Sequence, residues 1–427
     1  MSALPPDSSV LTFKDARRVV EEQAALVLAG KVLARNAQAG AREFEDLLAA
    51  VGRVLAEPVL ADRDLPPFAR STRDGYAVRS ADLKQVPATL EVIGEIKAGA
   101  RAENIPSQIA KGQAASIMTG APVPAGADAV VMVEYSSQDG ERVDVTRGVV
   151  PGENIVPRGA EARQGSLLVD RGMRLNEVSL ALAASVGKAR LEVYRRPRVA
   201  VLTTGDEIVD VNATPGATQI RNSNCYSLAS QILSAGAQPV LLPISPDEPV
   251  KLRQLIELGI RSDLLLLTGG VSMGRYDLVE QVLTEMKAEF FFTGAKIQPG
   301  RPVVFGKCGA GSSSGGTYFF GLPGNPVSTM VTFELFARPM IEALAGQAAK
   351  KLAFLHARLK SEIRVKNGLT RFLPAILSGE FENSEVELVA WQGSGDIAAA
   401  ARANCYAVIP PDRDVISGGE WVAVMMR

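Results

Sequence analysis

The sequence lacks the residues of a disulfide framework or a soft-ligand metal site. Among 427 residues there are three cysteines, Cys225, Cys308 and Cys405, and a single histidine, His356. The cysteines lie far apart, which excludes disulfide scaffolds and zinc-ligand spacing. His356 stands in an alternating stretch, where a structural role is expected. Any chemistry must therefore rest on carboxylates, Lys and Arg, hydroxyls and backbone groups.

The sequence also lacks an excess of charge of either sign and any long hydrophobic run. The formal net charge is −1, whereas nucleic-acid binders usually carry a basic excess. No apolar run approaches the roughly 20 residues of a membrane helix, and residues 1–10 do not have the basic-then-apolar order of a signal peptide. We therefore predict no nucleic-acid partner, no membrane partner and a cytoplasmic location.

Periodicity divides the chain into parts with different patterns, and its length predicts two to four domains. Residues 12–59 are helix-like, with apolar residues near a 3.6-residue spacing. The predicted division is a discontinuous N-terminal domain (1–60 and 157–195, with a helix over 176–186), a mostly β domain (61–156), an α/β domain (196–346), and a C-terminal β-barrel or sandwich (347–427).

The α/β domain is the most clearly patterned part. Three apolar strands, at 199–202, 239–244 and 263–267, alternate with helices at 226–234, 248–258 and 277–286, and a longer helix at 326–344 closes the unit. This alternation predicts a doubly wound parallel sheet, with the all-leucine run 264–267 as a central strand. Residues 311–316 (GSSSGG) are predicted to form a hairpin tip.

Glycine-rich, hydroxyl-bearing loops follow three strands of this domain, at residues 203–207, 268–274 and 321–328. Ligands of open α/β sheets bind beyond the carboxyl ends of the strands. Glycines let backbone N–H groups approach a ligand, and helix N-termini add positive potential. One such loop could be a plain turn, but three together predict a phosphate-bearing ligand.

Acidic residues accompany the same loops, at Asp206, Glu207, Asp247 and Asp277. Clustered carboxylates beside a phosphate site suit Mg²⁺, which prefers oxygen ligands and is often shared with the substrate. Asp247 and Asp277 could instead cap the helices that follow them.

Six motifs in order resemble the molybdopterin molybdenumtransferase family, which is related to the C-terminal half of gephyrin. The resemblance extends from about Phe13 to Val424. The motifs are STRDGYA (71–77), MTGAPVP (118–124), TTGDE (203–207), TGGVSMGRYD (268–277), QPGRP (298–302) and LPGNPVS (322–328).

The resemblance implies an elongated helical and β N-terminal domain, a mostly β second domain, a molybdopterin-binding α/β domain and a small C-terminal β-barrel. It implies a Mg²⁺-dependent transferase that converts adenylylated molybdopterin and molybdate into molybdenum cofactor and AMP. It also implies a head-to-tail homodimer, with each active site between the α/β domain of one subunit and the second domain of the other. Molybdopterin adenylyltransferase and molybdoenzyme clients are the implied protein partners.

The resemblance also assigns site residues. The implied catalytic residues are Asp74, Thr119, Glu207, Asp247 and Asp277. The acid cluster itself indicates Asp206, Glu207, Asp247 and Asp277 as metal ligands. The implied substrate-binding residues are Thr204, Gly205, Gly269, Gly270, Ser272, Pro323, Gly324 and Asn325. The candidate molybdate ligands are Gln298, Arg301, Ser328, Arg371 and Ser394.

The chain departs from the family pattern mainly among the anion contacts. Gln298 stands where the family often has Lys, so we expect Lys296 or Arg301 to supply the charge. Glu161 replaces a family Asp, and Gly395 stands where many members have His. The rival functions are a binding-only scaffold and the adenylyltransferase step. Retained acidic positions argue against the first and the flanking β domains against the second, whereas tungstate and molybdate cannot be distinguished.

Overall fold

The computed structural model describes residues 10–33, 41–269, 278–309, 316–348 and 350–427. The chain forms two compact units. Unit 1 comprises the described parts of residues 1–44, together with 52–56 and 192–427, and unit 2 comprises 45–51 and 57–191. β2 (Arg42–Asp46) and β13 (Arg190–Tyr194) lie where the chain passes from one unit to the other. The finer division into four domains stays a prediction.

Unit 1 is built on a six-stranded sheet in the order β17-β14-β18-β23-β22-β19. The first four strands are parallel, as predicted, whereas β22 and β19 extend the sheet in antiparallel fashion. The predicted central strand, β18, has neighbours on both sides and is buried throughout. The strands are β14 (Arg198–Thr203), β17 (Gln238–Leu241), β18 (Leu264–Thr268), β19 (Glu289–Phe292), β22 (Val304–Cys308) and β23 (Thr317–Leu322).

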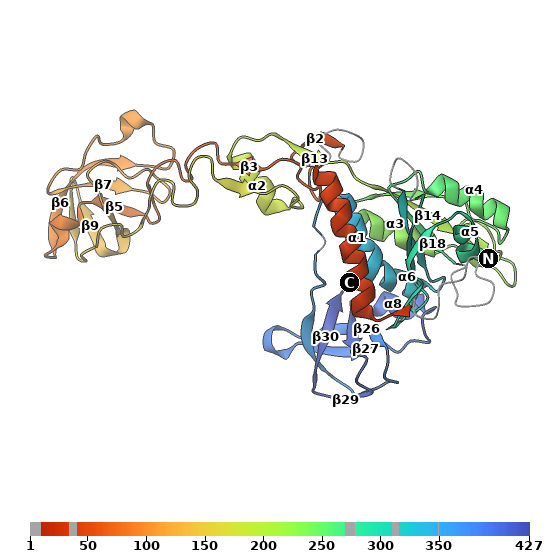
Figure 1. Ribbon diagram of the computed structural model, residues 1–427. Coiled ribbons are helices and arrows are strands. Elements are labelled where there is room, and N and C mark those ends of the chain that lie inside the picture. The colour runs from red at the N-terminus through yellow and green to blue at the C-terminus, as the bar shows by residue number, and fades with distance from the viewer. Residues whose placement is uncertain (1–9, 34–40, 270–277, 310–315, 349) are drawn as a thin grey trace. The chain divides into compact units, whose positions relative to one another are not determined.

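Alternate residues of these strands pack into separate cores on the two faces of the sheet. Leu264 and Leu266 join one core with α3 (Asn224–Ser234). Leu265 and Leu267 join the other with α4 (Pro249–Gly259) and α5 (Leu278–Glu285). A strand that is buried on both faces needs an apolar residue at every position, which explains the unbroken leucine run. α1 (Phe13–Leu33), labelled in Figure 1, packs along α7 (Arg338–Leu344) on the first face.

The predicted helix over 326–344 is confirmed, but a π-helical turn interrupts its α-helical hydrogen bonding. The segment forms α6 (Pro326–Thr332), a π-helical turn (Phe333–Ala337) and α7 (Arg338–Leu344). Pro339 explains the interruption, because proline has no N–H to donate and its ring clashes with the carbonyl one turn earlier. A π-helical turn widens the helix by one residue and accommodates the ring.

The helical prediction for residues 12–59 is also wrong after α1. Residues 42–46 are extended as β2, and residues 47–52 form turns. The apolar side chains that suggested a helix there are not buried, since Phe44 is 55% and Leu48 is 87% exposed. Helix-like spacing predicts a helix only where the apolar stripe finds a surface to cover it.

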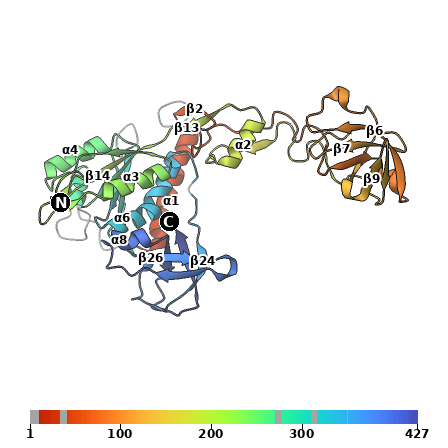
Figure 2. The same ribbon diagram turned by 180° about the vertical axis from the view of Figure 1, so that it is seen from behind.

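The C-terminal part of unit 1 is a closed β-barrel, so the sandwich alternative is wrong. The strands follow the order β26-β27-β24-β30-β28, and β28 pairs back with β26. β21 joins β26 in parallel, with Gln298 opposite Arg371. The strands are β21 (Ile297–Gln298), β24 (Leu355–Leu359), β26 (Thr370–Ser378), β27 (Glu385–Leu388), β28 (Cys405–Ile409) and β30 (Trp421–Met426). α8 (Ile397–Arg402) contacts α6, and both are labelled in Figure 2.

Short strand pairs complete unit 1. β1 (Val10–Leu11) pairs with β20 (Gly294–Ala295), and β15 (Ile208–Val209) pairs with β16 (Ile220–Arg221). β25 (Ile363–Arg364) pairs with β29 (Val415–Ile416). The pair β15–β16 lies directly before α3 and borders the site described below.

Unit 2 contains a six-stranded sheet in the order β8-β5-β7-β6-β10-β9. The sheet lies within the region predicted to be mostly β, and the helix predicted over 176–186 is α2 (Glu177–Ser185), which begins with a reciprocal capping box between Asn176 and Ser179. The strands of the sheet are β5 (Gly75–Val78), β6 (Ala88–Ile96), β7 (Gln113–Ile117), β8 (Ala129–Met132), β9 (Ser136–Asp139) and β10 (Arg142–Val145). Two outer pairs are β11 (Ile155–Val156) with β4 (Arg70–Ser71), and β12 (Leu167–Val169) with β3 (Val59–Leu60).

Gly75, in the STRDGYA motif, is required by close strand packing. Its φ is +157°, and a Cβ at this position would lie 1.8 Å from the carbonyl oxygen of Val131 in β8. We expect Gly75→Ala to lower the free energy of unfolding by about 2–4 kcal/mol, because backbone must move to admit the methyl group. Urea unfolding measures this loss.

Gly94→Ala is the matched control, because an added methyl in β6 would meet only Pro106 at 3.4 Å, an ordinary contact. The control should change the unfolding free energy by less than about 1 kcal/mol. Equal losses in the two variants would show that the contact with Val131 is not the cause.

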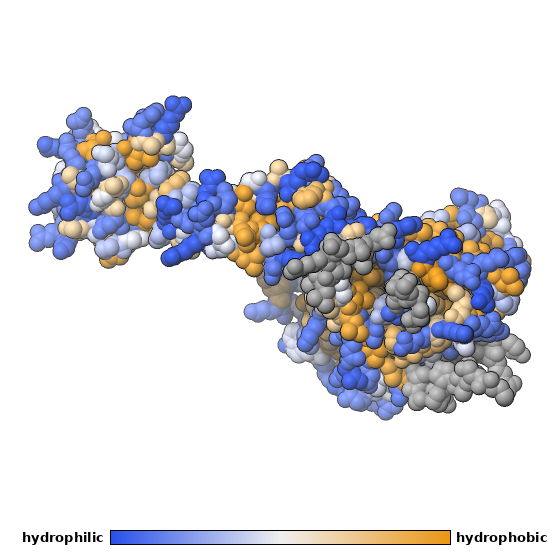
Figure 3. All heavy atoms as spheres, turned by 45° about the horizontal axis from the view of Figure 1, so that its top comes forward, coloured by the Kyte–Doolittle hydropathy of each residue, from blue (hydrophilic) through white to orange (hydrophobic). Residues whose placement is uncertain are grey.

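The face of the molecule drawn in Figure 3 intersperses hydrophilic and hydrophobic residues. Ion pairs between exposed side chains, such as Arg101 with Glu103, contribute little to stability. Within the described residues, no helix is long and apolar enough to cross a membrane.

Candidate functional site

Two adjoining cavities lie at the carboxyl edge of the sheet in unit 1. The first, here called the sheet-edge cavity, has a volume of about 740 Å³ and is lined by the loops after β14, β18 and β23. The second, here called the cationic cavity, has a volume of about 890 Å³ and lies between the QPGRP loop and the barrel. Pro302, Pro323 and Asn325 line both cavities, so a bound molecule can extend from one into the other.

The sheet-edge cavity collects most of the predicted substrate-binding residues. Its lining includes Thr204, Gly269, Pro323, Gly324 and Asn325. Gly205 is not part of the lining, and Gly270 and Ser272 lie outside the described residues. The structure adds residues that the sequence analysis did not single out, namely Arg221 at the end of β16 and Asn222, Ser223 and Asn224 where α3 begins.

Gly269 lets two of the loops touch through their backbones. Its φ is +93°, and a Cβ there would lie 2.2 Å from the carbonyl oxygen of Thr204. The backbone of the loop after β18 therefore contacts the backbone of the loop after β14. A side chain at Gly269 would separate the loops and widen the cavity.

The predicted acids form a hydrogen-bonded group beside this cavity. Thr204 Oγ1 donates to Asp247 Oδ1 at 3.0 Å, and the backbone N–H of Asp247 donates to Asp206 Oδ1 at 3.1 Å. Glu207 lines the cavity, with its carboxylate folded against Gly205. The N-cap of α4 is Glu248, not Asp247, so the helix-capping alternative for Asp247 is wrong.

The fourth predicted acid, Asp277, lies outside the described residues. Within the described ranges, no group of three His, Cys, Asp or Glu side chains converges in a way that could hold a metal ion. Asp206 and Asp247 do lie together and offer only oxygen donors. Mg²⁺ is commonly held by one or two carboxylates plus substrate phosphate oxygens, so this donor set fits an ion that arrives with the substrate.

The cationic cavity brings together all five candidate molybdate ligands. Its lining includes Gln298, Arg301, Ser328, Arg371 and Ser394. Lys296, one suggested source of compensating charge for Gln298, is not among the lining residues. Lys366 is, although the sequence analysis did not find it. Three cations and no carboxylate thus line a cavity that suits an oxyanion.

Arg371 is the least exposed of these cations. It lies in β26, is 5% exposed, and donates from Nη1 to the carbonyl oxygen of Leu369 at 3.2 Å. No carboxylate of the described residues forms an ion pair with it. Burial lowers the pKa of the guanidinium from its ordinary value, because desolvation disfavours the charged form. An anion in the cavity would supply the partner that this cation lacks.

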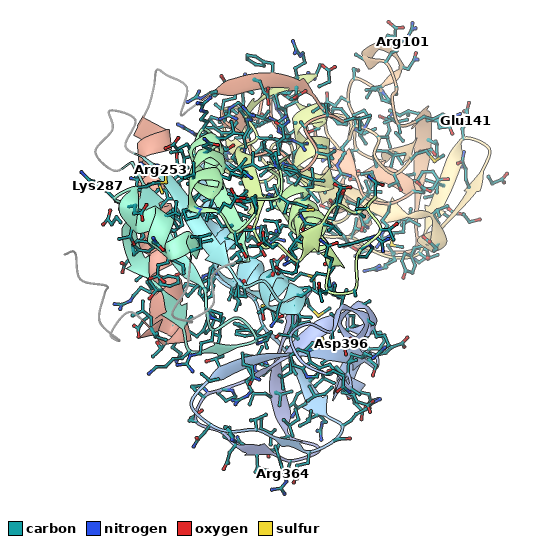
Figure 4. All side chains as sticks on the ribbon, turned by 90° about the vertical axis from the view of Figure 1, so that its right-hand side faces the viewer. Arg101, Glu141, Arg253, Lys287, Arg364 and Asp396 are labelled. Atoms are coloured by element: carbon teal, nitrogen blue, oxygen red, sulfur yellow. The ribbon has the colours of Figure 1, made fainter. Side chains whose placement is uncertain are left out.

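Ser394 is held at the cavity wall by two hydrogen bonds from the start of α6. Its carbonyl oxygen accepts from the N–H of Val327, and its Oγ accepts from Asn325 Nδ2 at 2.9 Å. Asp396, labelled in Figure 4, fixes the same turn by accepting from the N–H groups of Ala399 and Gln392. These bonds lower the pKa of Asp396, with that from Ala399 the largest cause. Because Ser394 Oγ already accepts, its own proton remains available to an anion.

In unit 2, Asp74 and Thr119 form one hydrogen-bonded pair. Asp74 Oδ1 accepts from the backbone N–H of Thr119 at 2.6 Å and from its Oγ1 at 2.8 Å. The bonds lower the pKa of Asp74, with the backbone bond the larger cause. Gly75 pairs with Ile117 in the register of β5 and β7, which sets the two motifs beside each other. Glu161, at the position of a family Asp, accepts from Arg70 Nη2 at 3.0 Å.

Comparison with known protein families covers almost the whole chain. A model of the MoeA N-terminal region, domains I and II, matches residues 11–187. A model of a probable molybdopterin-binding domain matches residues 200–343, and a model of the MoeA C-terminal region, domain IV, matches residues 356–426. Both cavities are lined by residues within the second and third matches.

Individual relatives are similar over nearly their full length. The chain is 34% identical to the molybdopterin molybdenumtransferase of Nostoc sp., over 90% of this chain and 88% of the relative. It is 32% identical to the enzyme of that name from Bacillus subtilis, over 91% and 90%. The crystal structure of the molybdopterin biosynthesis protein MoeA from Pyrococcus horikoshii superposes with a TM-score of 0.76 at 25% identity, covering 98% of this chain and 100% of that one.

Proposed function

Because this chain belongs to the molybdopterin molybdenumtransferase family and is a transferase of molybdenum cofactor biosynthesis, we propose that it inserts molybdate into adenylylated molybdopterin and releases AMP. The observation that carries this proposal is the cationic cavity. It is lined by three cations and no carboxylate, and it adjoins a second cavity walled by glycine-rich loops.

The cationic cavity suits a tetrahedral dianion. Arg371 offers a buried positive charge, Arg301 and Lys366 add two more exposed ones, and Ser394 has a hydroxyl proton to donate. Charge-assisted hydrogen bonds of this kind are the strongest contacts that a protein makes to oxyanions. Gln298 and Ser328 complete the set with polar groups. A cavity that recognises its ligand by charge and shape is expected to bind tungstate as well as molybdate.

The sheet-edge cavity suits the organic substrate. It offers backbone and hydroxyl groups from three loops, one cation, Arg221, and one acid, Glu207. The sulfurs that receive molybdenum belong to the substrate, so the chain needs no thiolate ligand. Its own cysteines agree with this role, since Cys225, Cys308 and Cys405 are all buried and free, and burial raises the pKa of Cys308 to about 12.

We propose that Asp206 and Asp247, with Glu207 and Asp277, hold a Mg²⁺ ion shared with the substrate's pyrophosphate. Such an ion, when bound, neutralises charge on the phosphate oxygens during cleavage. Thr204 orients Asp247 through its hydrogen bond, and Asp206 fixes the backbone of the Asp247 loop.

We propose further that the protein acts as a cytoplasmic homodimer, in which Asp74 and Thr119 of one copy complete the cavities of the other. The support is the family resemblance, together with the ionised state that hydrogen bonds from Thr119 favour in Asp74. A carboxylate held in this way can orient the substrate or position water.

The test incubates the pure protein with adenylylated molybdopterin, Mg²⁺ and molybdate. We expect AMP release with molybdenum retained on the pterin. AMP release without molybdenum transfer would contradict insertion, and stable binding without turnover would favour the scaffold alternative.

Arg301→Ala separates anion binding from chemistry. Arg301 is exposed at the mouth of the cationic cavity, so we expect its loss to raise the KM for molybdate about tenfold with little change in kcat. Steady-state rates over a wide molybdate range measure both constants. A lower kcat that no molybdate concentration restores would contradict a purely anion-binding role.

A further inference from the structure

Trp391 supplies an aromatic surface to the cationic cavity. It lies in the segment between β27 and α8 and is one of the residues that line this cavity. Among the described residues that line either cavity, it is the only aromatic one. The other lining residues are aliphatic, polar or charged. A flat heterocycle that enters the two cavities therefore meets a single aromatic side chain on which it can stack.

A ligand in the cavity can reach the side chain of Trp391. The residue packs against three separate apolar cores, and it nevertheless remains partly exposed. The cores account for its buried surface, and the cavity that it lines accounts for surface that stays accessible. Trp391 thus both anchors the cavity wall in the apolar interior and presents part of itself to a ligand.

Hydrogen bonds hold the backbone on both sides of Trp391. The carbonyl oxygen of Ala390 accepts from Arg402 Nη2 at 3.3 Å, and the N–H of Gln392 donates to Asp396 Oδ2 at 3.0 Å. Arg402 is the last residue of α8 and Asp396 is its N-cap, so one short helix fixes both neighbours. A side chain held by packing and by its flanking backbone has little freedom to lose when a ligand stacks on it.

The cationic cavity is larger than an oxyanion needs. Its volume of about 890 Å³ lies in the range of roughly 300–1,000 Å³ that is usual for sites of whole organic ligands, whereas molybdate is a single tetrahedral ion. Arg301, Lys366 and Arg371 provide the charge that the ion requires. The remaining space can hold part of the organic substrate.

The chemistry of the substrate selects the pterin as that part. Under the proposed function, on which this inference rests, molybdate must reach the dithiolene sulfurs. The dithiolene is carried by the ring that is fused to the pterin, whereas a pyrophosphate and a ribose separate it from adenine. The heterocycle nearest to the bound oxyanion is therefore the pterin, and its aminopyrimidinone ring is flat enough to stack on an indole.

We propose that Trp391 is a substrate-binding residue on whose indole ring the pterin of adenylylated molybdopterin stacks, while the cations of the same cavity hold the oxyanion. Stacking of a heterocycle on an aromatic side chain tightens binding by about tenfold. The contact also fixes the plane of the pterin, and with it the direction in which the dithiolene sulfurs face the ion. Trp391 thus orients the substrate as well as binding it.

Fluorine NMR on the full chain labelled with 5-fluorotryptophan tests the contact directly. The chain has two tryptophans, Trp391 and Trp421, so two signals are expected, and Trp421→Phe assigns them. Pterin should shift the Trp391 signal, because a stacked ring changes the magnetic field at the indole, and AMP should not. Trp421 is the internal control, since it is 53% exposed in β30, lines neither cavity and should respond to neither probe.

Trp391→Leu measures the effect of the contact on turnover. It should raise the KM for adenylylated molybdopterin about tenfold and leave the KM for molybdate within about twofold. Trp391→Phe keeps an aromatic face and should stay close to wild type, as should the matched control Trp421→Leu. Structural damage would instead raise both KM values, because both ligands occupy the cavity. If Trp391→Leu does not fold, the NMR measurement on the unsubstituted chain decides alone.

Two results would overturn the assignment, while AMP release in the turnover assay leaves the proposed function standing. One is a Trp391 signal that pterin does not shift, or that AMP shifts in its place. The other is a folded Trp391→Leu variant whose KM for adenylylated molybdopterin equals that of wild type. A chain that neither responds to pterin nor releases AMP contradicts the stacking contact and the proposed function together.

Discussion

Arg371→Met is expected to lower kcat/KM for molybdate by about 10²-fold or more, because a charge in a water-poor site interacts strongly with a dianion. The same variant should be at least as stable as wild type. Arg371 is 5% exposed and makes no ion pair with a described carboxylate, and an uncompensated buried charge is itself destabilising. A loss of activity with no loss of stability is characteristic of a binding residue.

Steady-state rates measure the loss of kcat/KM, and thermal unfolding with and without molybdate measures stability and molybdate binding. A ligand that binds only the native state raises the melting temperature, by an amount that grows with the logarithm of its concentration relative to Kd. Wild type should therefore be stabilised by molybdate in the absence of the pterin substrate, and Arg371→Met should not. Arg371→Lys keeps the charge without the planar fork and should retain an intermediate response.

Arg364→Met is the matched control, since Arg364, labelled in Figure 4, lies in β25 of the same C-terminal part, is 72% exposed and pairs with Glu362. It should keep the wild-type response to molybdate. If Arg371→Met and Arg364→Met both respond like wild type, the cationic cavity is not the oxyanion site.

Sequence analysis places the site residues most accurately where a local pattern, such as a loop after a parallel strand, determines their position in the fold. The loops after β14, β18 and β23 could be placed at one edge because the carboxyl ends of parallel strands meet there. Lys366 could not be found in this way. It lies in the loop before β26, and only the pairing of Gln298 with Arg371 brings that loop to the QPGRP segment. A register between strands about seventy residues apart is not encoded in local periodicity.

The acids illustrate a second limit of sequence analysis. Asp247 precedes a helix and satisfies the pattern for an N-cap, yet its carboxylate accepts from Thr204 instead. Both arrangements give the carboxylate a hydrogen-bond donor, and only tertiary packing decides between them. Asn224 shows the same limit, because its amide nitrogen donates to Thr268 and Gly324, which are distant from it in sequence. The antiparallel direction of β22 and β19 could not be predicted either, because an apolar run does not indicate the direction of its strand.

Asp74→Asn is expected to reduce turnover by about 10²-fold or more if the carboxylate acts in the transition state. The substitution preserves shape but removes the charge that hydrogen bonds from Thr119 favour. Thr119→Ala removes one of those bonds and should raise the pKa of Asp74 toward its ordinary value. NMR titration of the carboxyl carbon measures that shift.

The sign of the pH effect follows from the lowered pKa of Asp74. Hydrogen bonds to the carboxylate stabilise the folded state above the pKa of the unfolded chain, and this stabilisation is lost as the pH falls through the lower, folded-state pKa. In Thr119→Ala the acid limb of the rate profile should therefore move to higher pH. An unchanged limb, together with near-wild-type turnover of Asp74→Asn, would remove Asp74 from the active site.

Mixing two inactive variants tests whether Asp74 and Arg371 act in the same site from different copies. In a head-to-tail dimer of Asp74→Asn with Arg371→Met, one site carries both changes and the other carries neither. Random exchange of subunits makes half of the dimers mixed, so activity should recover to about a quarter of wild type. If each site is instead built from the residues of one copy, every site keeps one of the two substitutions and no activity returns. Recovery would thus establish both the dimer and the complementary contribution of the two units, which neither single variant can do alone.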